Sequence, residues 1–406
     1  MDNDTKTGYW LLIRQHFGLL AISFIAMFSG NLGQSFFIGL FQQDIAQSLN
    51  LSAGAFGSVY AAITMVSGFL VMHFGAKLDW ISPRHYALLV LTTLLIGVAL
   101  LTLSPWLITA IIGLGLVRLC GQGLMNHFGS TLAGREFTIN RGRALGVVSL
   151  GMPVGEILLP PLLAVLIGWL SWQQIWWAVT LLIATMWLLL FIFSPWPPAP
   201  EIKRDARGNK IRGPNPLREW RFWQLIPLTM ALPVTLTGIF IYQAQMTNDL
   251  NATTTAYALG LMAMGLARFP GALMGGRWVD EWGVTLLARL YLLPFFLTII
   301  AAIIFGGNAG VLILMIGAGV SLGMSSPVVD SLLVILWGRE HLGRVRSVKS
   351  ALMVFSTGVA PAILGFLIDD GVSFIAILMG MLVFMLLGWL LAQGQIALAA
   401  KHSEIA

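Results

Sequence analysis

The stretch GAKLDWISPR, residues 75–84, comes back in altered form as GRWVDEWG, residues 276–283. In both copies a glycine precedes an aspartate by four positions, and the two copies lie 201 residues apart. Gly142 and Gly343, each followed by an arginine, repeat at the same separation. Two matches at one spacing indicate that the chain contains a structural duplication.

Each copy follows a long apolar run, and runs of this kind cover the chain. A membrane-spanning helix needs about 20 apolar residues. The runs that meet this length are 17–40, 53–74, 86–104, 106–131, 145–169, 175–195, 223–246, 255–275, 284–306, 309–336, 348–368 and 374–394. The chain is also 57% hydrophobic and only 10% charged, whereas soluble domains carry about 25% charged residues. We therefore predict an all-α integral membrane protein with twelve transmembrane helices.

Lys and Arg residues mark alternate gaps between these runs. Of the 23 Lys and Arg residues, 21 lie in the two termini or in the gaps 75–86, 134–144, 196–222, 276–289 and 337–349. By the positive-inside rule, the basic gaps face the cytoplasm. We expect a multi-pass protein of the cell (inner) membrane with both termini cytoplasmic. The net charge of +6 then belongs to these loops, and no nucleic-acid partner is expected.

The longest polar gap, residues 196–222, divides the chain into halves. It holds seven basic residues and a pair of prolines, a composition typical of a linker. We predict an N-terminal six-helix bundle at 1–195 and a pseudo-symmetric C-terminal bundle at 223–406. In the repeated loops, glycine permits a tight turn, and aspartate can cap a helix or pair with an arginine. The predicted cytoplasmic latch consists of Gly75, Asp79, Arg84, Gly276 and Asp280.

These features resemble the major facilitator superfamily, whose signature between helices 2 and 3 is a Gly-x-Leu-Ala-Asp-Arg-x-Gly-Arg-like loop that often recurs between helices 8 and 9. The resemblance covers the whole chain in length, helix count, linker and loops. The run RLCGQG, residues 118–123, also resembles the arginine motif of that family's helix 4. The resemblance implies a transporter in which two bundles rock around one central site, lined by helices 1, 4, 7 and 10.

Arg118 and Arg268 are the two basic residues left over from the basic gaps and the termini, and both lie inside apolar runs. A basic residue at the centre of a membrane helix costs about 2.5–3.5 kcal/mol to insert, so both are candidates for function. Gln122 and Asn126 follow Arg118 at helical spacing and extend it into a polar stripe. Arg118 is expected either to line or gate the transport pathway or to form a structural ion pair.

Arg268 offers a planar guanidinium fork, which suits a carboxylate, although it could instead extend toward the inner membrane surface. The run LARFPG, residues 266–271, resembles the helix-8 stretch of the monocarboxylate-transporter branch, in which an arginine binds the substrate carboxylate. This resemblance implies that Arg268 binds an organic anion. By resemblance to the superfamily, helices 1 and 7 contribute neutral candidate contacts: Asn31, Gln34 and Tyr242.

Three further residues are candidates for proton coupling: Glu156, Asp330 and His127. An apolar setting favours the neutral form of a carboxyl unless a cation lies beside it, so Glu156 could carry a proton or serve as a fixed counter-ion of Arg118. Asp330 could handle protons or form a gate salt bridge with Arg268 or Lys349. His127 lacks a second ligand at metal-binding spacing, so no metal is predicted.

The sequence therefore predicts a secondary active transporter for a small organic solute. We expect an organic anion such as a monocarboxylate, coupled to a proton gradient. The alternative is a proton-coupled drug or cation exporter that binds its substrate through Glu156 and Asp330. A sensor or scaffold built on the same fold is the competing class. No phosphate-cradling glycine loop and no nucleophile-base pair is visible, so neither a cofactor nor an enzymatic activity is predicted. The expected partners are the solute, protons and the lipid bilayer, and we expect a monomer.

Overall fold

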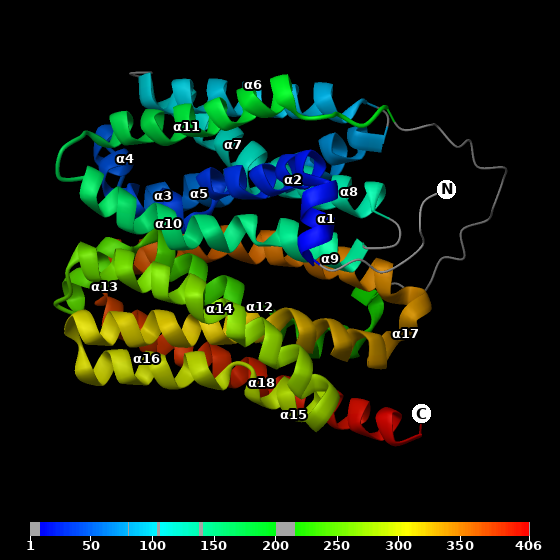
Figure 1. The fold of residues 1–406 in the computed structure, drawn as a ribbon. Coiled ribbons are helices and arrows are strands. Elements are labelled where there is room, and N and C mark those ends of the chain that lie inside the picture. The colour runs from blue at the N-terminus through cyan, green and yellow to red at the C-terminus, as the bar shows by residue number, and fades with distance from the viewer. Residues whose placement is uncertain (1–8, 80, 104–105, 138–140, 200–215, 406) are drawn as a thin grey trace, which may run out of the picture. The chain divides into compact units, whose positions relative to one another are not determined.

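The computed structural model describes residues 9–79, 81–103, 106–137, 141–199 and 216–405. Every regular element in these ranges is a helix (Figure 1). Eleven helices are long and apolar enough to cross a membrane, or twelve if one pair of segments bent by 98° counts as a single span. Within the described residues, the prediction of an all-α membrane protein with twelve spans is confirmed.

The chain forms two compact units. Unit 1 comprises residues 1–45 and 62–206, and unit 2 comprises residues 46–61 and 207–406. The predicted bundle limits, 1–195 and 223–406, stay a prediction. Residues 200–215 of the predicted linker lie outside the described part of the chain.

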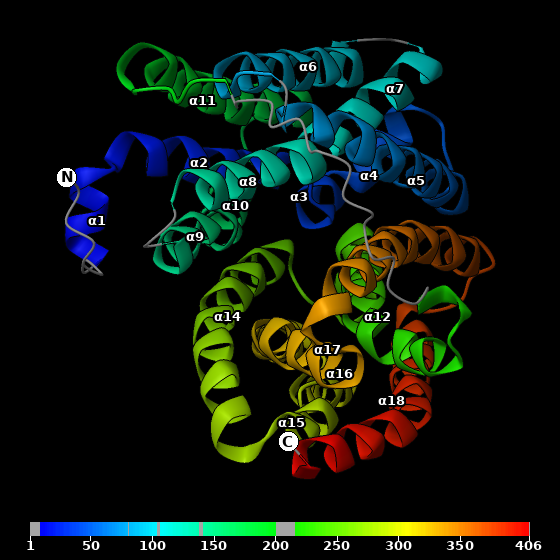
Figure 2. The ribbon, with the colours of Figure 1, turned by 90° about the vertical axis from the view of Figure 1, so that its right-hand side faces the viewer.

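Unit 1 holds the helices of the first half. They are α1 (Tyr9–Gln15), α2 (Phe17–Ser29), η1 (Gly30–Gly33), α3 (Ser35–Leu40), η2 (Ala76–Asp79), α6 (Pro83–Leu103), α7 (Leu107–Arg118), η3 (Leu119–Met125), α8 (Asn126–Glu136), α9 (Arg141–Ser149), α10 (Gly151–Leu166) and α11 (Trp172–Phe193). Two helices, α4 (Gln42–Ser48) and α5 (Ala53–Gly75), have residues in both units. In Figures 1 and 2, α6 and α11 lie side by side. The segments α7, η3 and α8 follow one another without a gap and form one span.

Unit 2 holds the helices of the second half. They are η4 (Pro216–Arg218), α12 (Trp220–Ile241), α13 (Gln243–Asp249), α14 (Thr254–Trp282), α15 (Val284–Leu290), α16 (Leu293–Phe305), α17 (Gly307–Asp369) and α18 (Phe374–Ile405). The ribbon of α17 doubles back in Figure 1 and contains two spans, Gly307–Trp337 and Leu352–Asp369. The gap predicted between the runs 309–336 and 348–368 is therefore helical.

The duplication is visible in the backbone as well as in the sequence. Asn50 and Asn251, again 201 residues apart, have positive φ angles of 53° and 55°, a conformation that asparagine tolerates better than most residues. Two residues later, Ser52 and Thr253 cap the next helix, and their hydroxyls accept an amide hydrogen three residues on, at 3.2 and 3.1 Å. The same turn and cap thus introduce α5 and α14.

Candidate functional site

The first predicted span is interrupted in unit 1. Helix α2 ends at Ser29, the tighter η1 follows, and Gln34 has an extended ψ of 150° before α3 begins. The Nδ2 of Asn31, a fully buried residue, donates to the carbonyl of Phe28 at 2.8 Å. A side chain that bonds to its local backbone in this way competes with regular helix geometry. The break is therefore encoded by a Gly-Asn-x-Gly sequence that apolar length alone does not reveal.

Glycine lets the broken helix approach the fourth span closely. A Cβ atom on Gly33 would lie 2.7 Å from the Val117 carbonyl oxygen, 2.9 Å from Gly121 Cα, and closer still to the Gln122 amide nitrogen. All three neighbours are backbone atoms, which cannot move aside as a flexible side chain can. The helix break and the start of η3 are thus in direct backbone contact, as glycine permits in membrane helix pairs.

Arg118 forms hydrogen bonds across this contact. Its side chain is almost fully buried, and one terminal nitrogen donates to the Gly33 carbonyl at 2.7 Å while Nε donates to Thr64 Oγ1 at 3.1 Å. In a regular helix the Gly33 carbonyl would bond to the amide of Phe37, but that amide bonds to Gln34. The guanidinium therefore supplies a donor to a carbonyl that the helix break releases. Directly after Arg118 the chain widens into η3, a π-helical segment, a form often found at functional sites.

The predicted polar stripe lies along the same contact. Asn126 Nδ2 donates to the Gln122 carbonyl at 2.8 Å, and a Cβ atom on Gly30 would lie 2.5 Å from Asn126 Oδ1. The Oδ1 atoms of Asn31 and Asn126 are buried and accept no hydrogen bond from the described residues. A buried oxygen in this state costs about 1–3 kcal/mol unless a water or ligand donates to it. Asn31, Asn126 and Arg118 all lie along the contact between the broken first span and the fourth span, and we refer to them as the buried polar cluster; its two asparagine oxygens can each receive a donor group.

Glu156 lies on α10, a helix that packs on the same helix break. Its side chain is buried, and the preceding Gly155 packs so closely on Asn31 that a Cβ atom there would collide with the Asn31 amide. The structure thus brings the residue before Glu156 into contact with Asn31, two residues before the Gly33 carbonyl to which Arg118 donates. Gln34, the other polar residue of the break, is half-buried.

His127 lies beside a residue of the predicted latch. A Cβ atom on Gly75 would be 3.2 Å from the imidazole Cδ2 of His127, so this glycine leaves room for the ring. Arg84, at the start of α6, donates to the Phe191 carbonyl of α11 at 3.3 Å. For the other latch residues, Asp79, Gly276 and Asp280, the structure describes only the helical backbone.

Arg268 lies in unit 2 on α14, at a point where the backbone of this helix packs closely against α17. A Cβ atom on Gly271 would be 2.7 Å from the Val320 carbonyl oxygen, and one on Gly323 would collide with the carbonyl of Arg268 itself. The arginine is half-buried, while Leu266, on another face of α14, is 53% exposed. Arg268 therefore belongs to a close helix pair within the unit.

Asp330, on α17, lies near the ammonium group of Lys349. Its Oδ1 is 3.8 Å from Lys349 Nζ, and Ser326 Oγ donates to its Oδ2 at 3.4 Å. Lys349 was one of the two partners that the sequence predicted. The geometry allows the gate salt bridge of that prediction, and the role of the pair stays a prediction.

Tyr242 lies at the break between α12 and α13. The residue is fully buried, and its hydroxyl is 2.8 Å from the Ala53 carbonyl oxygen and 2.7 Å from that of Pro361. A phenol carries one hydrogen, so the two carbonyls share it. In this structure the hydroxyl holds backbone of unit 2 together, and its predicted contact with substrate stays a prediction.

Sequence reasoning missed a cap in unit 2. The carboxylate of Asp369 accepts hydrogen bonds from Ser52 Oγ at 2.7 Å, from the Ala53 amide at 3.0 Å and from the Gly54 amide at 2.8 Å. Aspartate at a helix N-terminus stabilises both the free amides and the helix dipole. The serine cap at the start of α5 was detectable in the sequence, but its distant partner was not. Among the described residues, no group of three His, Cys, Asp or Glu side chains could hold a metal ion.

Two comparisons with known proteins agree with this fold. A bacterial homologue of the human lysosomal transporter Spinster, solved in an inward-facing, occupied conformation, is 15% identical, and 96% of each chain is covered with a TM-score of 0.66. The inward-facing, unoccupied structure of such a homologue is 13% identical, with 95% of each chain covered and a TM-score of 0.62. At this identity the likeness concerns the fold alone. No curated protein sequence matches the chain significantly.

The family is established by sequence. The family profile described as Major Facilitator Superfamily matches residues 22–244, more than half of the chain. This match includes the first latch loop, the arginine stripe and the broken first span. The protein is therefore a membrane transporter and not an enzyme, and it belongs to the major facilitator superfamily.

Proposed function

We propose that the protein transports a small organic anion, with a carboxylate as the preferred charged group, by alternating access coupled to protons. The chain is expected in the inner membrane with both termini in the cytoplasm. The observation that carries the proposal is the placement of Arg268. This arginine is half-buried and lies within a membrane span, where the backbone of α14 packs closely against α17. Inserting a charged arginine into a membrane helix is unfavourable, so an arginine at this position is expected to serve a function.

The buried polar cluster of unit 1 supports the same proposal. Arg118 contributes positive charge, and the amide oxygens of Asn31 and Asn126 lack donors among the described residues. A hydroxylated carboxylate offers both an anionic group and hydroxyl donors. We expect the cluster to interact with such polar groups, directly or through water.

Proton coupling is assigned to Glu156. It is buried on α10, and the preceding Gly155 packs on Asn31 of the buried polar cluster. A nearby guanidinium favours the ionised carboxyl, and a conformational change that separates the two groups favours protonation. Alternating access can therefore load and release a proton. Asp330 and His127 are the other candidates.

The proposal is tested by carboxylate uptake into proteoliposomes. Charge-assisted hydrogen bonds contribute about 1.5–3 kcal/mol, so Arg268→Ala should raise the KM about 10- to 100-fold. Arg268→Lys keeps the charge but loses the planar fork of the guanidinium, so its KM should lie between those of the wild type and of Arg268→Ala. The matched control is Arg277→Ala on the same helix, because Arg277 is 75% exposed and pairs with Glu281.

The result that would contradict the proposal is an unchanged KM in Arg268→Ala protein. If lipophilic amines compete for transport and carboxylates do not, the protein is a cation or drug exporter. In that case Glu156 and Asp330 become the expected binding carboxylates.

A further inference from the structure

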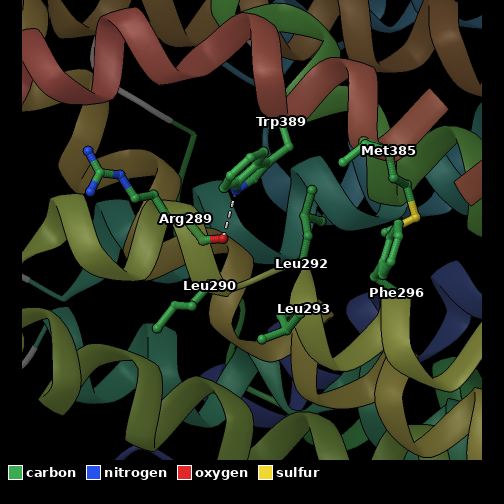
Figure 3. A pocket seen from close by; sticks show the side chains of 8 residues that line it. Arg289, Leu290, Leu292, Leu293, Phe296, Met385 and Trp389 are labelled. Atoms are coloured by element: carbon green, nitrogen blue, oxygen red, sulfur yellow. Dashed lines mark hydrogen bonds between the residues drawn. The ribbon is translucent and has the colours of Figure 1, made fainter. Parts of the chain in front are cut away.

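A cavity opens on unit 2 between the kinked ninth span and the last helix. The span is divided at Tyr291–Leu292 into α15 and α16. Pro294, in the first turn of α16, has no amide hydrogen, so the regular helical bond to Leu290 cannot form. The resulting cavity has a volume of about 240 Å³. Its apolar lining includes Leu386 and the residues Leu292, Leu293, Phe296, Met385 and Trp389, which are labelled in Figure 3.

The mouth of this cavity lies among exposed apolar side chains of two membrane-spanning helices. Leu290, Leu293 and Leu386 line the cavity and are 37%, 43% and 46% exposed. They belong to spans with mean hydropathies of 2.2 and 2.6. Exposed leucine on a membrane helix contacts lipid. An apolar cavity among such residues fits an acyl chain.

Arg289 adds a positive charge at one end of the cavity. Figure 3 shows its side chain extending past the leucines, at the opposite end from Phe296 and Met385. It is exposed and belongs to the basic gap 276–289, which the charge distribution assigns to the cytoplasmic side. An arginine at this depth can extend its guanidinium to the phosphates of the membrane surface.

Trp389 fixes the wall of the cavity near the arginine. Its indole Nε1 donates to the Arg289 carbonyl oxygen at 2.9 Å (Figure 3). Tryptophan with an engaged N–H and an apolar ring is typical of the region between headgroups and hydrocarbon. The bond joins α15 to α18, so it holds the backbone of Arg289 against the apolar wall.

The duplicated half provides a comparison. Arg84-x-Tyr86 at the start of α6 matches Arg289-x-Tyr291 in the ninth span, and both tyrosines are buried. In unit 1 the guanidinium of Arg84 donates to the Phe191 carbonyl. The guanidinium of Arg289 makes no hydrogen bond or ion pair with any described residue. Arg289 is therefore available to an external anion, whereas Arg84 already has an internal acceptor.

We propose that this cavity binds an anionic phospholipid of the cytoplasmic leaflet, with its phosphate on Arg289 and an acyl chain against Phe296 and Met385. The apolar cavity selects a lipid over free phosphate, and the cation selects an anionic headgroup. The inference does not depend on which solute is transported. It assigns the protein a lipid-binding site outside the transport pathway.

Native mass spectrometry of the purified full-length protein, with phosphatidylglycerol or phosphatidylcholine added, tests the proposal. We expect the wild type to retain phosphatidylglycerol more tightly than phosphatidylcholine. Arg289→Gln should weaken phosphatidylglycerol binding about fivefold, the effect of one arginine near a membrane surface. Arg289→Lys should retain most of the binding. Arg84→Gln, the matched control, should bind as the wild type does.

A second variant tests the cavity itself. Leu386→Trp should fill the space and lower the binding of both lipids, because the acyl chain loses its place. The reactivity of buried Cys120 verifies that each variant is folded. Undiminished phosphatidylglycerol binding in Arg289→Gln protein would overturn the proposal. Equal losses of phosphatidylglycerol binding in the Arg289→Gln and Arg84→Gln variants would also overturn it. The same holds if the protein forms a dimer that binds no lipid and Leu386→Trp abolishes that dimer, because a second copy would then occupy the cavity.

Discussion

Gly33→Ala should loosen the contact between the broken first span and the fourth span. The added methyl group would lie 2.7 Å from the Val117 carbonyl oxygen and 2.9 Å from Gly121 Cα. Because both neighbours are backbone, the two helices must separate. Overpacking of this kind costs about 1–3 kcal/mol. The shift also moves the Gly33 carbonyl, to which Arg118 donates at 2.7 Å.

The single cysteine makes this effect measurable. Cys120 is fully buried and adjacent to Gly121. A thiol-reactive fluorogenic maleimide labels it only when the contact opens. If opening precedes labelling, a destabilisation of about 1–3 kcal/mol should accelerate labelling about fivefold to a hundredfold.

The matched control is Gly380→Ala in α18, where an added Cβ atom would meet nothing within 4 Å. Alanine is a better helix former than glycine, so this variant should label no faster than the wild type. Equal labelling rates in the Gly33 and Gly380 variants would refute the close contact as a source of stability.

Three further predictions concern transport in proteoliposomes. Asp369→Asn should weaken the cap on α5 by about 0.5–2 kcal/mol and thereby change the transport rate. Asp370→Asn should leave the rate unchanged, and equal rates in the two variants would contradict this prediction. Asp79→Asn and Asp280→Asn should alter the rate while equilibrium substrate affinity stays within a few-fold, and wild-type rates would leave these loops only a role in topology. Glu156→Gln should abolish accumulation driven by a pH gradient yet preserve solute exchange, and continued accumulation would make Glu156 a structural counter-ion.

Hydrophobic length and charge distribution were sufficient to predict the spans. The second to ninth observed spans begin and end within a few residues of the predicted runs, because length and apolar character are what the bilayer requires. The repeat was also predictable, and the positive φ angles of Asn50 and Asn251 extend it to the backbone. These features depend on local sequence.

The features that the sequence did not reveal depend on distant partners. The break at Gly30–Gly33 was missed because a window of apolar residues does not register local competition by Asn31. The bond from Arg118 to the Gly33 carbonyl required knowledge of that break. The prediction of one contiguous first span was therefore incomplete. It omitted the interruption, which releases a backbone carbonyl for the arginine.

For other candidate residues the sequence identified the residue but did not predict its hydrogen bonds and neighbours. Depth in the membrane brought Glu156 and Arg118 into consideration together; Arg118 donates to the helix break, and Gly155, the residue before Glu156, packs on it. Tyr242 was selected by helix number, but its hydroxyl is bonded to two carbonyls within unit 2. Such bonds depend on tertiary packing, which periodicity in a single sequence does not specify.

The central claim is tested most directly by uptake of labelled small carboxylates into proteoliposomes that contain only this protein, with and without an imposed inward proton gradient. The account predicts accumulation above the external concentration when the gradient is present, its collapse when a protonophore is added, and competition by unlabelled carboxylates but not by lipophilic amines. Carboxylate movement that never exceeds equilibration, or competition by amines alone, would contradict the account.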